Sequence, residues 1–96
     1  MRLDLSRDAD ADLDDILTYG VQTFGLSIGR DYYFSFDSAF AFLRENPRAG
    51  QVDEETGLGL RRWHHRKHRI FYRVGKEAIL VVRILHHARD LDEADF

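Results

Sequence analysis

The chain has 96 residues, 44% hydrophobic and 12% aromatic, which is enough for one small core but not for two. It contains no cysteine, and this excludes a disulfide framework and a thiolate zinc site. Residues 1–10 lack the apolar core of a signal peptide, and no apolar run approaches the roughly 18 residues needed to span a bilayer. The composition therefore predicts a single soluble domain, residues 1–96, located in the cytoplasm.

The net charge of −3 hides a strong division along the chain. Residues 58–89 contain nine Lys or Arg and one acid, a net charge of +8. Residues 1–57 contain five basic and twelve acidic residues, net −7, and residues 90–96 add −4. A charge division of this kind predicts a positive face that meets an anionic partner.

The first predicted elements are a short strand and a helix. Residues 3–5 alternate between apolar and acidic, which is typical of a strand. Ser6 can cap a helix whose first turn contains Asp8 and Asp10, and Gly25 can end it. Apolar or small residues recur at helical spacing and predict its buried face: Ala9, Leu13, Ile16, Gly20 and Phe24.

A second helix is predicted at once, with Ser27 as its cap and Asn46-Pro47 as its end. Because the connection is so short, the two helices should be antiparallel neighbours in an αα-hairpin. The inner face of the second helix is expected to consist of Ile28, Tyr32, Phe36, Ala39, Phe40 and Leu43.

Three strands are predicted after a polar loop at residues 48–59. They are residues 60–64, 69–74 and 77–86. Gly75-Lys76 reads as a two-residue type II′ turn, and the unbroken apolar run at 79–82 indicates a central strand. The predicted fold class is α+β, in the order β-α-α-β-β-β, with a small antiparallel-rich sheet packed against the αα-hairpin.

Six short motifs, in this order and spacing, cover nearly the whole chain. They are Leu13-Asp14-Asp15-Ile16, Glu45-Asn46-Pro47-Arg48-Ala49-Gly50, Gly59-Leu60-Arg61, Ile70-Phe71-Tyr72-Arg73-Val74, Val82-Arg83-Ile84-Leu85-His86 and Ala88-Arg89-Asp90. With them the chain resembles the ParE branch of the RelE/ParE toxin–antitoxin superfamily, which includes plasmid stabilisation proteins. It departs from that family at His87, where glycine is usual, and at His65, where an apolar residue is usual.

The resemblance implies the toxin of a type II toxin–antitoxin system. Such a toxin inhibits DNA gyrase by binding, needs no cofactor, and is neutralised by a ParD-like antitoxin in a hetero-oligomer. The antitoxin is a ribbon-helix-helix protein, so contact with nucleic acid would be indirect, through the antitoxin. No membrane partner is implied.

Two clusters imitate metal sites. Starting a calcium loop at Asp8 would need glycine and glutamate where the chain has Leu13 and Tyr19, so the aspartates are interpreted as a solvated helix face. Adjacent histidines on a strand point to opposite faces, so only His64 or His68 meeting His86 across strands would assemble ligands. No metal site is predicted.

A ribosome-dependent endoribonuclease of the RelE type is the enzymatic alternative. Arg73 and Arg83 could stabilise a phosphorane-like transition state, while His86 or His87 moved the proton of a 2′-hydroxyl. His86 could equally close the last strand with a hydrogen bond. The resemblance favours this second interpretation, because Leu-His followed by Ala-Arg-Asp belongs to the non-nuclease branch.

The candidate binding residues combine cations with surplus aromatic surface. Arg61, Arg73 and Arg83 are expected to form one cationic stripe across neighbouring strands, suited to carboxylate groups. Trp63 is expected to pack partly against the hairpin or to anchor an interface, and an antitoxin helix is expected in a groove beside Tyr33 and Phe42. The full set is Arg61, Arg62, Trp63, Arg73, Arg83, His86, Arg89, Tyr33 and Phe42.

Overall fold

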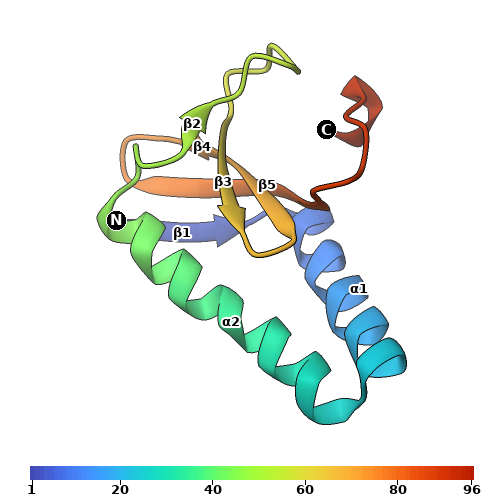
Figure 1. Cartoon of the computed structure of the whole chain (residues 1–96). Coiled ribbons are helices and arrows are strands. Elements are labelled where there is room, and N and C mark those ends of the chain that lie inside the picture. Colours follow the sequence, from blue (N-terminus) through green and yellow to red (C-terminus); the bar gives the residue numbers. More distant parts are fainter.

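The computed structural model describes residues 1–92 and 94–96 in full, and only the backbone of Glu93. Two helices cover one face of a mixed sheet of five strands (Figure 1). The elements are β1 (Arg2–Leu5), α1 (Arg7–Phe24), α2 (Leu26–Glu45), β2 (Gln51–Val52), β3 (Arg61–His65), β4 (His68–Val74), β5 (Ala78–His86) and the 3₁₀ turn η1 (Glu93–Asp95). The predicted α+β fold is confirmed, although the short strand β2 lies in the segment that was expected to be a loop.

The spatial order of the strands is β1-β5-β4-β3-β2. β1 runs parallel to β5, and the other neighbouring pairs are antiparallel. β5 therefore lies between two strands, as its unbroken apolar run predicted. A β-bulge places Val82 as an extra residue, since Phe71 pairs with Arg83 and Tyr72 with Val81.

The start of α1 agrees with the sequence, whereas the start of α2 does not. Ser6 Oγ accepts a hydrogen bond from the Ala9 N–H at 2.9 Å, so the predicted cap is confirmed. α2 has no side-chain cap, and the Ser27 cap was wrong, because Gly25 alone ends α1 and begins α2. The φ of Gly25 is 94°, a left-handed backbone conformation that favours glycine.

The backbones of the two helices are in close contact at Gly20 and Gly29. A Cβ atom built on Gly29 would lie 2.4 Å from the backbone nitrogen of Val21, so no other residue fits there without backbone movement. From this end the helices diverge toward the sheet, and the tip of the hairpin projects beyond it (Figure 1). Phe24 and Ile28 near the tip are therefore 55% and 60% exposed, and their predicted burial was wrong.

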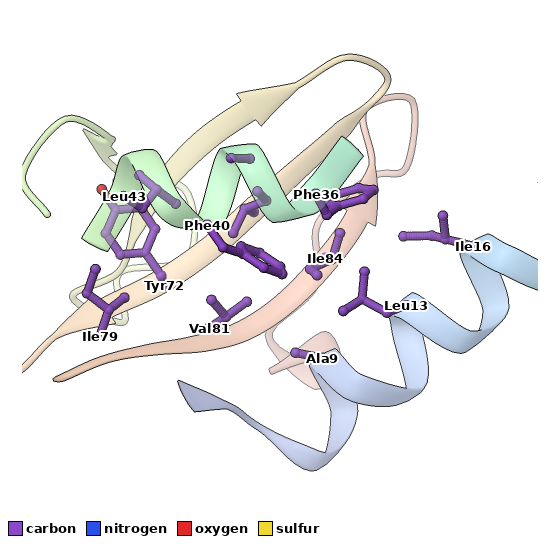
Figure 2. Close-up of a cluster of buried hydrophobic side chains, with 12 residues drawn as sticks. Ala9, Leu13, Ile16, Phe36, Phe40, Leu43, Tyr72, Ile79, Val81 and Ile84 are labelled. Atoms are coloured by element: carbon purple, nitrogen blue, oxygen red, sulfur yellow. The ribbon is translucent and has the colours of Figure 1, made fainter. Parts of the chain in front are cut away.

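The main core fills the space between the helices and the sheet. Leu13 and Ile16 from α1 and Phe36, Phe40 and Leu43 from α2 point toward the strands (Figure 2). The strands contribute Ile70, Tyr72, Ile79, Val81 and Ile84. Because residues 70 and 72 of β4 lie on this helix-covered face, residues 69, 71 and 73 lie on the opposite, outer face.

The hairpin turns between the last strands differ from the prediction. β5 begins at Ala78, and the Gly75 N–H donates to the Ala78 carbonyl at 2.9 Å without the positive φ that a type II′ turn requires. The tight two-residue turn lies instead at Arg66-Lys67, between the paired residues His65 and His68, and Arg66 has a φ of 53°. In the described part of the chain, neither helix is both long and apolar enough to cross a membrane.

Candidate functional site

An apolar groove of about 730 Å³ lies between the hairpin and the paired ends of β4 and β5. Its lining residues are Asp12, Asp15, Ile16, Tyr19, Gly20, Phe24, Ile28, Gly29, Tyr32, Lys67, His68, Ile84, Leu85, His86 and Arg89. The exposed residues Tyr19, Phe24 and Ile28 place a large apolar area in reach of solvent. A groove of this shape and composition suits the apolar face of a helix.

A hydrogen-bonded cluster closes the sheet side of the groove. Tyr32 Oη accepts the N–H of Lys67 at 3.2 Å, so its own proton is free for His68 Nδ1, which lies 2.6 Å away. The pKa of His68 is lowered to about 4, mainly by burial and also by the nearby His86, His65 and His87, while Asp12 opposes the shift. His68 is thus neutral near pH 7, and its proton is assigned to Nε2 by this network.

His65 fastens α2 to the turn between β3 and β4. The Ser35 hydroxyl donates to the carbonyl of Tyr32, so the 2.7 Å contact between Ser35 Oγ and His65 Nε2 has the histidine as donor. Burial lowers the pKa of His65, and the nearby Arg66 lowers it further. His65 and His68 are therefore used to join the hairpin to the sheet.

His86 lies at the end of β5 with its side chain exposed. Its Nδ1 accepts the N–H of Ala88 at 3.1 Å, which is the strand-closing hydrogen bond expected of a structural role. His86 also pairs with His68 across the strands, with ring centroids 5.4 Å apart, which is one of the two meetings considered above as a condition for a metal site. Among the described residues, no group of three or more His, Asp or Glu is placed to hold a metal ion.

The predicted arginine stripe is not present. Arg61 pairs with Tyr72 and lies on the helix-covered face, where it donates to the carbonyl of Gly50 at 2.8 Å. Arg73 is the next residue after Tyr72 and lies on the outer face. The prediction was wrong because it assumed that the three arginine side chains lie on the same face of the sheet, although the sequence does not determine the register between their strands.

Most of the remaining predicted cations have partners within the chain. Arg83 forms a two-point ion pair with Asp12, at 2.8 and 2.9 Å, and this hydrogen bonding raises the pKa of Arg83. Arg62 lies 3.4 Å from both Asp53 and Glu55. Only Arg89 of the predicted arginines lines the groove, together with Lys67, which the sequence had not singled out.

The predicted aromatic residues lie away from the groove. Trp63 stacks on Phe42 with ring centroids 5.0 Å apart and packs against the core, as does the half-buried Tyr33. Partial packing of Trp63 on the hairpin was thus expected correctly, but neither Tyr33 nor Phe42 lines the groove. The groove uses Tyr19, Phe24 and Ile28 instead, and these were missed because the hairpin was expected to bury the last two.

The structure defines a small α+β domain with an apolar groove open to solvent, and comparisons with known proteins identify its family. The family model of the ParE toxin of type II toxin–antitoxin systems, parDE, matches residues 3–91. A Toxin ParE1 of Caulobacter vibrioides is 40% identical over 84 residues, which cover 88% of this chain and 86% of the relative. A Toxin ParE1 of Mycobacterium tuberculosis is 34% identical over 89 residues, with 92% and 91% covered.

A solved structure described as a chromosomal ParDE toxin–antitoxin system from P. aeruginosa aligns with a TM-score of 0.79 at 26% identity. The alignment covers 90% of this chain and 95% of that one. The chain belongs to the ParE toxin family and is the toxin component of a type II toxin–antitoxin system.

Proposed function

We propose that this toxin acts in the cytoplasm by binding DNA gyrase, without catalysing a reaction, and that a ParD-like antitoxin neutralises it by filling the apolar groove. The observation that carries the antitoxin part is the exposure of Tyr19, Phe24 and Ile28 around one continuous hollow. Such a surface is costly to leave open in a free protein. The relatives named as ParE toxins and the ParDE structure support a dedicated partner of this kind.

The charges around the groove indicate what its occupant should carry. Lys67 and Arg89 lie at the strand side, and Asp15 lies on α1. An amphipathic helix would place apolar side chains against Ile16 and Ile28, with an acidic residue toward Lys67, because Arg89 is already paired with Asp95. The acidic-apolar segment of a ribbon-helix-helix antitoxin has this chemistry.

The arrangement of the candidate nuclease residues supports a non-enzymatic toxin. His86 pairs with His68 and lies on the helix-covered side, whereas Arg73 and Arg83 belong to the outer face. Arg83 is also committed to Asp12. An acid or base and a charge stabiliser must both reach one scissile phosphate, and these residues are placed on opposite faces of the sheet.

The target is tested with purified gyrase and relaxed plasmid. Folded toxin, titrated in, should reduce supercoiling, and preincubation with its antitoxin should restore it. A ribbon-helix-helix protein encoded beside the toxin gene is the antitoxin to use in this test. Undiminished supercoiling at saturating toxin would exclude gyrase as the target.

The groove is tested by co-purification of the toxin with that antitoxin. Phe24→Glu and Ile28→Glu place charges in the groove and should abolish co-purification. Phe34→Glu is the matched control, because Phe34 is also an exposed aromatic of the hairpin but does not line the groove. Loss of co-purification in Phe34→Glu alone would show that the antitoxin does not bind in the groove.

A further inference from the structure

The outer face of the sheet has a small apolar centre of its own. Leu60, Phe71 and Leu85 are almost completely buried there, although both helices lie on the other face. The acidic segment, residues 90–96, covers this centre by packing Leu91 and Phe96 on it. The Phe96 ring meets Phe71 edge to face at 5.1 Å, and the segment lies on the side of the sheet away from the hairpin (Figure 1).

The acidic segment is held by few bonds. Arg83 donates to the main-chain oxygen of Asp95, and Arg89 pairs with its carboxylate. No strand pairing joins the described residues of the segment to the sheet. Two bulky apolar residues and charge contacts therefore hold it, and such a segment can detach without disturbing the strands.

Arg69 is a buried cation on the same face. Its side chain is among the buried ones, at 9% exposure, and pairs across the strands with Leu85. It donates to the carbonyl of Arg89 at 2.7 Å and lies over the ring of Phe71, but its Nε has no partner among the residues whose side chains the structure describes. Among the described residues, no carboxylate lies within ion-pair distance of it. A buried cation normally has a counter-ion, so this surface is incomplete without an anion.

We propose that the outer face is a second docking surface, which receives an acidic protein segment carrying two bulky apolar residues. Residues 90–96 occupy this surface as an intramolecular competitor. The partner's apolar residues replace Leu91 and Phe96 over Phe71, and a carboxylate reaches Arg69. The apolar centre favours a peptide over nucleic acid, because phosphates would pair with arginines but leave Leu60 and Phe71 uncovered.

This surface lies on the face of the sheet away from the hairpin, although it shares Leu85 and Arg89 with the lining of the groove. The proposal holds whether or not gyrase is the target. A tethered segment acts at an effective concentration in the millimolar range, and an external segment must compete with it. Release of residues 90–96 should therefore strengthen binding of an external peptide of the same chemistry.

The experiment measures fluorescence anisotropy of a labelled peptide, DLDEADF, added to the full chain. Leu91→Ala combined with Phe96→Ala releases the native segment and should strengthen peptide binding at least tenfold. Leu26→Ala combined with Phe34→Ala removes two exposed apolar groups of α2 that do not line the groove, and it should leave the affinity at the level of the unaltered chain. If the double variant does not fold, Phe96→Ala alone gives the same comparison.

Two further arms define the chemistry. Arg69→Gln in the released variant should weaken peptide binding at least tenfold, whereas Arg44→Gln on α2 should not. A peptide with asparagine and glutamine in place of its acids should not bind. Equal peptide affinity of the unaltered and released chains, no binding to either, or tighter binding of single-stranded DNA than of peptide would each overturn the proposal.

Discussion

The two faces of the sheet are closed in different ways. The helix-covered face buries a continuous core beneath α1 and α2 (Figure 2), whereas the outer face buries only Leu60, Phe71 and Leu85 beneath one short segment. Arginines surround the outer cluster, but few charged groups enter the inner core. The helix-covered face therefore supplies most of the stability. The outer face is suited to exchange residues 90–96 for a segment of another protein.

The largest difference between the faces should come from truncating the inner core. Phe36 is 1% exposed, and Phe36→Ala leaves a cavity between α2 and the sheet. We expect the free energy of unfolding to fall by about 3–5 kcal/mol, measured by urea denaturation. Phe34→Ala on the same helix should change it by less than about 0.5 kcal/mol, because Phe34 is exposed. Equal losses in the two variants would contradict the assignment of the core.

The next effect should come from the ion pair that connects the two faces. Asp12 on α1 holds Arg83 and also accepts the backbone N–H of Ile84 at 2.8 Å. Asp12→Asn leaves Arg83 without its carboxylate, so the free energy of unfolding should fall by about 2 kcal/mol. Asp14→Asn, exposed on the same helix, is the control and should be nearly neutral. Neutral behaviour of both would show that this pair does not matter for stability.

Acid should weaken the joint between the hairpin and the sheet. The pKa of His68 is lowered to about 4, below its unfolded value near 6.5, so the folded state binds fewer protons in this interval. The stabilisation is complete above pH 6.5 and is lost as the pH falls toward 4. Between pH 7 and 5 the loss should be about 1 kcal/mol, allowing for solvent screening. His68→Gln should flatten this dependence, and an unchanged pH profile would contradict the role of His68.

The smallest effect should come from uncovering the outer face. Phe96→Ala removes the edge-to-face contact with Phe71, and we expect a loss of about 1 kcal/mol in the free energy of unfolding. The difference between the losses in Phe36→Ala and Phe96→Ala measures how unequally the two faces contribute to the free energy of unfolding. A loss above about 3 kcal/mol would show that the outer segment is a fixed part of the core.

Much of the architecture could be predicted because its signals are local. The Ser6 cap, the helical stripe through Leu13 and Ile16, and the helix end at Asn46 each depend on neighbouring residues. The central place of β5 followed from its unbroken apolar run.

The functional surface was harder to predict, because it depends on contacts between distant segments. Whether Arg61 and Arg73 share a face is decided by strand register, and a shift of one residue reverses every side chain. The exposure of Ile28 depends on how far the hairpin projects beyond the sheet. Neither the strand register nor the projection of the hairpin can be read from a local sequence pattern.

Under the proposed function, this toxin acts by holding gyrase and not by cutting RNA. The most direct measurement is the topology of a reporter plasmid in cells that express the toxin alone, with primer extension on translated messages from the same culture. If the toxin holds gyrase, negative supercoiling is lost as growth stops, while the messages remain intact. A fully supercoiled plasmid accompanied by new cuts in the messages would contradict it.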